Sequence, residues 1–267
     1  ANFARTYASI LPGTWSDDGA QALALLDSLL DCGELNAQDL MERFAAWYEN
    51  GRYAVDNHVF DCGITTGRAI GDFLNGTPPE MCGPRDENSN GNGALMRVLP
   101  LALWHKGDDE TLIQMALVQS QITHGHLRSG LCCALLCLWA RELLAGHDWP
   151  FEKATRKLRD YCADSPQARE ELEFHIRPHD FRAGNGSGYV VDCLVSARWV
   201  MRENLYENVV KNAIALGNDT DTTACVAGGV AGIRGGFEQI PARWVQSLRG
   251  EEILAPIWEK LRRWWEF

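Results

Sequence analysis

Apolar residues recur every three to four positions along most of the chain, which is the spacing of one face of an α-helix. The apolar series from Ala22 to Leu30 predicts a helix that begins near Ala20, and Gly33 follows it as a helix stop. A second series, from Ile253 to Trp265, predicts a helix near the C-terminal end. Between them, the same periodicity predicts helices over residues 37–49, 65–74, 94–105, 111–122, 128–145, 188–202, 205–216, 220–235 and 239–248.

Alternating, strand-type segments are nearly absent, so the pattern predicts an all-α fold. We expect a single compact domain of roughly a dozen helices, with functional loops between them. Two turn-rich stretches, residues 77–92 and 180–188, have helical pattern on both sides and are not interpreted as linkers. Residues 1–267 are therefore treated as one domain. The longest apolar run, Leu131 to Leu144, contains Arg141 and Glu142 and is shorter than the ~18 residues of a bilayer span, so no membrane partner is expected.

Composition and charge narrow the classes of partner. The 267 residues carry a formal net charge of −11, which disfavours nucleic acid because phosphate binding needs clustered Lys and Arg. The densest basic stretch consists of Lys153, Arg156, Lys157 and Arg159, and it is interpreted as a solvated helix face. The nine cysteines are an odd number without regular spacing, and no apolar signal-peptide core is found near the start. We therefore expect buried, reduced thiols and a cytoplasmic protein.

Two short segments each place a hydroxyl residue and two acids at the start of a predicted helix. They are Ser16-Asp17-Asp18 and Asp219-Thr220-Asp221-Thr222. Helix capping is one interpretation, since Ser, Thr and Asp side chains accept hydrogen bonds from the unpaired N–H groups of a first turn. One acid per helix is enough for capping, whereas each segment supplies two.

Metal binding is the other interpretation of these segments. Carboxylate and hydroxyl oxygens are hard ligands that suit Mg²⁺, Ca²⁺ or Mn²⁺. If the two segments meet, four carboxylates share one cleft, and two divalent cations would compensate their charge. The sequence by itself leaves a binuclear metal site and separate helix caps both open. The helix after Thr222 is rich in Ala, Gly and Val, and we expect it to be central, packed on all sides, with its acidic N-terminus facing the cleft.

Five ordered motifs carry a resemblance to a known family. They are Trp15-Ser16-Asp17-Asp18, Phe60-Asp61-Cys62-Gly63, the glycine-rich segment from Asn90 to Arg97, Gly188-Tyr189-Val190-Val191-Asp192, and Gly217-Asn218-Asp219-Thr220-Asp221-Thr222. Together with the segments 227–232 and 240–244, they resemble the ADP-ribosylglycohydrolase family, most closely its bacterial dinitrogenase-reductase-activating type. The resemblance spans residues 13–244. It implies an all-α fold whose active-site cleft is formed by loops and helix N-termini, a binuclear Mg²⁺ or Mn²⁺ centre as cofactor, and hydrolysis of a glycosidic bond to ADP-ribose.

The resemblance also implies roles for individual residues. The metal ligands would be Ser16, Asp17, Asp18, Asp219, Asp221 and Thr222. Asp61 would face the substrate ribose, with a helix N-cap as the alternative. Asn90, Gly91, Asn92 and Gly93 would form a loop that binds the ADP-ribose phosphates at the N-terminus of a helix over residues 94–101, with an unliganded tight turn as the alternative. His124 and Tyr189 would border the same ligand, with a structural histidine and core aromatic packing as alternatives.

Two features depart from the family pattern. Many members begin with a helix that bears a Gly-Asp-Ala-Leu-Gly-type segment and an acid near the scissile bond, and this N-terminal segment is not found ahead of Ser16. Any acid that it supplies is therefore unassigned. Gly19 stands where many relatives have a hydroxyl residue, which we expect to loosen the surroundings of the ligands without removing one.

The function expected on these grounds is metal-assisted hydrolysis that removes ADP-ribose from a modified protein, most simply from arginine. Asp18 or Asp61 would handle the proton of the attacking water, because a general base must first be within reach. Cleavage of another ADP-ribosyl linkage, on serine, nucleic acid or O-acetyl-ADP-ribose, is an alternative. A second alternative is a non-catalytic immunity protein of the same fold that binds ADP-ribose or a toxin. A monomer is the default expectation.

Overall fold

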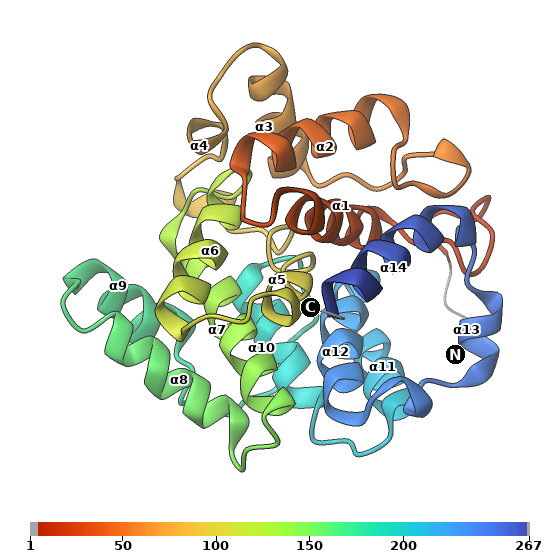
Figure 1. The fold of residues 1–267 in the computed structure, drawn as a ribbon. Helices are drawn as coiled ribbons and strands as arrows, with labels where there is room; N and C mark the ends of the chain where they lie inside the picture. Colours follow the sequence, from red (N-terminus) through yellow and green to blue (C-terminus); the bar gives the residue numbers. More distant parts are fainter. Residues whose placement is uncertain (1–4, 266–267) are drawn as a thin grey trace.

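The computed structural model describes residues 5–265, and these residues fold into helices joined by loops (Figure 1). The α-helices are α1 Asp17–Cys32, α2 Ala37–Asn50, α3 Ile64–Leu74, α4 Pro79–Cys82, α5 Leu99–Trp104, α6 Asp109–Gln121, α7 Leu127–Leu144, α8 Pro150–Tyr161, α9 Pro166–Glu170, α10 Val190–Val200, α11 Tyr206–Ala215, α12 Thr220–Gly235, α13 Ala242–Ser247 and α14 Glu251–Trp265. Short 3₁₀ turns lie at η1 Val55–Asn57, η2 Glu87–Ser89 and η4 Phe237–Gln239, and η3 Glu171–Ile176 is a π-helix.

The all-α prediction is confirmed. No strand forms within residues 5–265, where one isolated antiparallel bridge joins Gly91 to Tyr189. No helix in this range combines the length and the apolar character that a membrane crossing requires. Gly33 and Gly51 end α1 and α2 in left-handed backbone conformations, as expected of glycines that stop a helix.

The helix at the centre of the molecule is α7, whereas α12, which was expected to be central, packs beside it with no exposed residue between 222 and 235. Helices α6 and α8 contact α7 on one side, and α10 and α12 contact it on the other (Figure 1). Residues 129–140 of α7 are all buried, because this stretch is apolar or small on every face. Helix α12 packs against α11, α10 and α7, and a Cβ atom on Gly229 would collide with the side chain of Leu99 of α5. The small side chains of α12 thus serve close packing on more than one side.

One predicted helix is much shorter than the pattern suggests. Periodicity predicts a helix over residues 94–105, but α5 begins only at Leu99. Pro100 has no N–H to donate to the carbonyl of Met96, which disfavours a helix that continues from residue 94 through this point, whereas a proline is well tolerated in the first turn of α5. Residues 93–97 instead form tight turns, in which the N–H groups of Leu95 and Met96 both donate to the carbonyl of Asn92.

The remaining differences are smaller. The segment predicted over residues 239–248 is helical only over α13, and the turn-rich stretch 77–92 contains α4 and η2. The basic face of α8 is on a helix, as expected, but it is not simply solvated. Lys157 pairs with Asp109 at 2.7 Å, and Arg159 binds Glu173 at 3.0 Å.

The first and last described helices pack together, which closes the domain (Figure 1). Lys260 of α14 donates to Asp27 of α1 at 2.7 Å. Arg43 of α2 is buried between the acids of the same cluster and binds Asp27, Asp31 and Asp39. Because removing one partner of a buried ion pair is costly, this cluster fixes α1 against α2 and α14. The N-terminus of α1 is thereby held in place.

Candidate functional site

A cleft of about 270 Å³ lies where three helix N-termini meet. Its walls come from the starts of α1, α3 and α12, from the loop before α5 and from His124 and Gly188. The lining residues are Asp17, Asp61, Gly63, Ile64, Thr65, Thr66, Gly91, Asn92, Gly93, Met96, His124, Gly188, Asp219 and Thr222. Residues more than 200 positions apart in the sequence therefore share one cleft.

The acids at these helix starts do not act as caps. Ser16 is the N-cap residue of α1 and Asp219 that of α12, and neither side chain bonds to the backbone of its helix. Asp61 is not the N-cap of α3 either, since Gly63 occupies that position. The capping interpretation is thus wrong for these three residues. Asp61 and Asp219 line the cleft instead, and the hydroxyl of Ser16 is bonded to Asp18.

The first acidic segment contains an oxygen without a partner. The hydroxyl of Ser16 donates to Oδ2 of Asp18 at 2.8 Å, whereas Oδ1 of Asp18 is buried and unpartnered within the described residues. Burial raises the pKa of Asp17 and of Asp18 well above the usual carboxyl range. The charge of Asp18 adds to this rise at Asp17, and the charge of Asp221 adds to it at Asp18.

The second acidic segment lies against the first, which is the condition that the sequence left open. Asp219 and Thr222 line the cleft. The pKa of Asp221 is raised by burial of its carboxyl and then by the charges of Asp219 and Asp61. The mutual effects between residues 17–18 and 219–221 require that the carboxyls are close in space. This is the compact negative charge that the sequence suggests.

The donor chemistry of this cluster fits hard divalent cations. The groups are carboxylates and hydroxyls, one carboxylate oxygen is orphaned, and the acids repel one another. No three His, Cys, Asp or Glu side chains within residues 5–265 are arranged to hold a metal ion as they stand. Cation binding at this cluster would therefore draw the carboxylates closer and would also use hydroxyl oxygens.

Asp61 enters the cleft from the loop between η1 and α3. Its backbone is left-handed, with φ of 54°, which is uncommon for a residue other than glycine. Burial raises the pKa of the Asp61 carboxyl, and the hydroxyl of Tyr7 beside it counteracts part of this rise. Asp18, the other candidate for proton handling, does not line the cleft. Asp61 is thus the better placed of the two acids.

The glycine-rich loop is fixed by hydrogen bonds to two other segments. The side-chain amide of Asn92 donates to Oδ2 of Asp219 at 2.8 Å, and its backbone N–H donates to the carbonyl of Gly188 at 2.9 Å. The side chain of Asn90 is fully engaged, since it accepts from Ser129 at 2.9 Å and donates to a backbone carbonyl at 3.0 Å. Asn90 therefore shapes the loop, whereas Asn92 connects it to the acidic cluster.

The phosphate-binding helix N-terminus that was predicted behind the glycine loop does not form, and the uncapped N-terminus of α3 faces the cleft instead. Residues 94–97 are not an α-helix, so no helix begins behind the glycine loop. The N-terminus of α3 lines the cleft through residues 63–66 and carries no side-chain cap. Sequence analysis missed Gly63, Ile64, Thr65 and Thr66 as lining residues. The pair Thr65-Thr66, four and five residues after Asp61, was the available signal.

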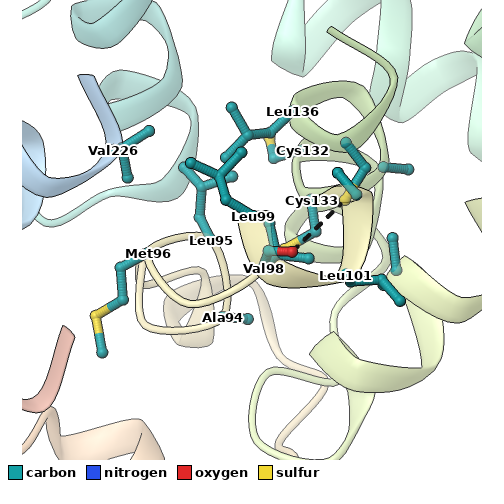
Figure 2. Packing of buried hydrophobic residues seen from close by; sticks show 14 of the residues in the cluster. Ala94, Leu95, Met96, Val98, Leu99, Leu101, Cys132, Cys133, Leu136 and Val226 are labelled. Carbon is teal, nitrogen blue, oxygen red and sulfur yellow. Dashed lines mark hydrogen bonds between the residues drawn. The ribbon is translucent and has the colours of Figure 1, made fainter. Parts of the chain in front are cut away.

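Met96 adds an apolar side chain to the cleft lining, as Ile64 does, and it was also missed. Figure 2 shows Leu95 and Leu99 directed into the core near Cys132 and Leu136 of α7, while Met96 is directed away from this cluster. The same residue is part of the cleft lining. The tight turns over residues 93–97 produce this division, because they direct one buried side chain of the series toward the cleft and the others toward α7.

A second hollow, of about 350 Å³, adjoins the cleft and shares Gly91 and Gly188 with it. Tyr189 and Asn90 line this second hollow and not the main cleft. Tyr189 is half-exposed, and its hydroxyl accepts from Arg128 at 3.1 Å. Core packing is therefore not the role of Tyr189, and the predicted ligand residues divide between two connected hollows.

His124 is buried at the wall of the cleft and lies directly beside the glycine loop. A Cβ atom on Gly93 would lie 2.9 Å from Cε1 of His124, so only glycine fits there. Burial, and then the charge of Arg97, lower the pKa of His124 to about 3. The imidazole is thus neutral at physiological pH, and any contact that it makes with a ligand is a hydrogen bond and not an ion pair.

The glycine at position 19 has a packing explanation. A Cβ atom on Gly19 would lie 2.7 Å from the indole of Trp15, whose N–H donates to the carbonyl of Tyr53 at 2.8 Å. A hydroxyl residue at this position would displace the indole. The expectation of looser surroundings is therefore wrong on this side of α1, where Trp15 fills the space.

Comparisons with known proteins agree with this architecture. The family model described as ADP-ribosylglycohydrolase matches residues 2–265. The solved structure of an ADP-ribosylglycohydrolase-related protein complex superposes with a TM-score of 0.74 at 31% sequence identity, over 95% of this chain and 82% of the other.

Two relatives that are similar to this chain in sequence carry names that agree with the family match. The ADP-ribosyl-[dinitrogen reductase] glycohydrolase of Rhodospirillum rubrum is 30% identical, over 89% of this chain and 74% of the relative. The ADP-ribosylarginine hydrolase Tri1 of Serratia proteamaculans (strain 568) is 27% identical, over 94% of this chain and 67% of the relative. The chain thus spans about two thirds to three quarters of the length of these relatives.

Proposed function

Since the chain belongs to the ADP-ribosylglycohydrolase family, we propose that it hydrolyses the N-glycosidic bond between ADP-ribose and an arginine side chain of a modified protein. The observation that carries this proposal is the meeting of two acidic helix starts in one cleft, where the carboxyls mutually raise their pKa values. The choice of arginine rests on the relatives named for ADP-ribosylarginine and for dinitrogen reductase.

The acidic cluster would hold two divalent cations, Mg²⁺ or Mn²⁺. The proposed ligands are Ser16, Asp17, Asp18, Asp219, Asp221 and Thr222, of which Asp18 offers the unpartnered oxygen. Bound cations would supply positive charge and Lewis acidity beside the anomeric carbon of the distal ribose. They would also remove the repulsion that keeps the pKa values of these carboxyls high.

Asp61 is the proposed proton acceptor. In the reaction, the bond between the anomeric carbon and the arginine nitrogen breaks, and a bond to the oxygen of water forms. The water loses one proton, and the departing guanidine gains one. A carboxyl whose pKa is raised accepts a proton more readily than an ordinary carboxyl, and Asp61 combines this property with a place in the cleft lining.

The phosphates of ADP-ribose would lie between the N-terminus of α3 and the glycine loop. Uncapped N–H groups at a helix start attract phosphate, and glycines allow it to approach the backbone. Tyr189 in the adjoining hollow would border the adenine. The arginine of the modified protein would leave through the open side of the cleft, where the side chain of Ile64 is 92% exposed.

Replacing Asn92 by Ala tests the link between loop and acids. The variant loses the hydrogen bond from the Asn92 amide to Asp219, and we expect ADP-ribose release to slow by roughly ten-fold to a hundred-fold, the effect of one hydrogen bond to a charged group. Asn75→Ala, at the exposed end of α3, is the matched control and should keep full activity. Equal rates in the two variants would contradict a role for Asn92.

The choice of linkage is tested by comparing substrates. Proteins or peptides that carry ADP-ribose on arginine or on serine are incubated with the chain and Mg²⁺ or Mn²⁺, and free ADP-ribose is measured. We expect multiple turnovers on arginine and much slower release from serine. Faster release from serine would refute the arginine assignment. Binding without any turnover would instead favour a non-catalytic ADP-ribose-binding protein.

A further inference from the structure

A fully buried arginine lies behind the cleft without a carboxylate partner among the described residues. Arg97 donates to the side-chain oxygens of Gln21 at 2.9 Å and Gln119 at 3.1 Å, and to the backbone carbonyl of Gln119 at 2.8 Å. Its remaining bond goes to the hydroxyl of Thr123 at 2.7 Å. The guanidinium is a permanent donor, so the direction of each of these bonds is fixed.

The direction of the bond from Arg97 determines whether the Thr123 hydroxyl donates or accepts in its other hydrogen bond. Oγ1 of Thr123 accepts from Arg97, and its own proton is left to donate. Nδ1 of His124 lies 2.9 Å away and is the other polar atom within reach of Oγ1 in the described part of the chain. The hydroxyl therefore donates to Nδ1, which must be the unprotonated nitrogen of the neutral ring.

The other edge of the ring faces the glycine loop. A Cβ atom on Gly91 would lie 3.4 Å from Nε2 of His124, and one on Gly93 would lie 3.3 Å from it. Nε2 makes no hydrogen bond to the described residues, and His124 is part of the cleft lining. The backbone of His124 is anchored separately, because its N–H donates to the carbonyl of Ser120 at 2.7 Å.

We propose that Arg97 and Thr123 are positioning residues that hold His124 as the Nε2–H tautomer, so that the ring presents a hydrogen-bond donor to an oxygen of the bound ligand beside Gly91 and Gly93. That the ligand is ADP-ribose rests on the proposed function. The assignment of the tautomer rests on the bonds alone. Because Arg97 donates to Thr123, the Thr123 hydroxyl donates to Nδ1 of His124, and the ring proton is left on Nε2 at the wall of the cleft.

The tautomer can be measured without any activity assay. Long-range proton–nitrogen correlation NMR of the ¹⁵N-histidine-labelled protein reports which ring nitrogen carries the proton, and the signals missing in His124→Gln identify His124. We expect protonation at Nε2 in the unsubstituted protein. Protonation at Nδ1 would overturn the proposal, whatever the protein does to ADP-ribose.

Thr123→Val removes the hydroxyl with little change in shape, and Thr123→Ser is the matched control that keeps it. Arg97 still bonds the carbonyl of Gln119 in both variants, which favours folding. We expect a mixed or inverted tautomer and roughly five- to ten-fold weaker ADP-ribose binding in Thr123→Val by calorimetry, and neither change in Thr123→Ser.

Unchanged tautomer and unchanged affinity in Thr123→Val would refute the role of Thr123. If the unsubstituted protein has the Nε2–H tautomer but does not bind ADP-ribose, the proposed function fails and the assigned bond directions stand. The two failures are therefore distinguishable.

Discussion

Asp17→Asn is expected to slow ADP-ribose release by roughly 10²–10⁴-fold, which corresponds to about 3–5 kcal/mol of transition-state stabilisation. The carboxyl of Asp17 is buried, lines the cleft and feels the charges of Asp18, Asp61 and Asp221. Asparagine keeps the shape and one oxygen of the side chain but removes the negative charge that would hold a cation. The rate of ADP-ribose release at saturating Mg²⁺ or Mn²⁺ measures the effect.

The same loss is expected for Asp221→Asn, because both acidic segments contribute to one cluster. Asp160→Asn is the matched control, since Asp160 is an exposed acid on α8, remote from the cleft. Circular dichroism should show the same helical content in all three variants. Undiminished release in both Asp17→Asn and Asp221→Asn would contradict the proposed metal site.

The stability of the protein without metal should fall as the pH rises from about 7 to 8.5. Burial and neighbouring charges raise the pKa of Asp17 to about 9, whereas its value in the unfolded chain is the ordinary 3.8. The folded state therefore binds more protons than the unfolded state, so the free energy of unfolding decreases with increasing pH. One such group contributes at most about 2 kcal/mol over 1.5 pH units, which is a shift of several degrees in Tm.

Most groups whose titration changes the stability in the opposite direction lie outside this pH window. Arg97 is the exception, because burial lowers its pKa to about 9 and it opposes the effect of Asp17 at the upper end of the window. The carboxyls whose pKa is lowered, such as Asp27 and Asp39, have finished titrating well below pH 7. The pKa of His124 is about 3 in the folded state and near 6.5 in the unfolded state, so His124 contributes little to the pH dependence of stability above pH 7.

Calorimetric melting in chelator is the measurement, with Asp17→Asn as the comparison. The variant should melt higher than the unsubstituted protein at pH 8.5 and depend less on pH. Excess Mg²⁺ or Mn²⁺ should raise the Tm of the unsubstituted protein and flatten its pH dependence, because cations replace protons at the carboxylates. A Tm that is independent of both pH and divalent cations would show that the cluster is neither strained nor a cation site.

The sequence predicts the helices well where apolar periodicity is long and uninterrupted. Helices α2, α3 and α12 begin and end within one residue of the predicted ranges. The prediction fails over residues 94–98, because periodicity ignores the missing N–H of Pro100. It also places α12 at the centre, whereas the central helix is α7, which is buried on every face over residues 129–140. The close packing indicated by the small residues of α12 does occur, since no residue from 222 to 235 is exposed.

The candidate site also divides into features that the sequence reveals and features that only the fold creates. Acidic segments at the starts of α1 and α12 are visible in the sequence because they contain more acids than capping needs. The lining by Thr65, Thr66 and Met96 is not, because it depends on how α3 and the turns before α5 face the cleft. The bonds from Arg97 to Thr123 and on to His124 could not be predicted either, since they require side-chain directions that periodicity does not give.

The most direct test of the account is release of ADP-ribose from an arginine-ADP-ribosylated protein, measured with Mg²⁺ or Mn²⁺ and then with a chelator. The account predicts many turnovers per protein molecule in the presence of a divalent cation, loss of release on chelation, and recovery when the cation is restored. Release that continues at the same rate in the chelator, or no release with either cation, would contradict a cation-dependent hydrolase.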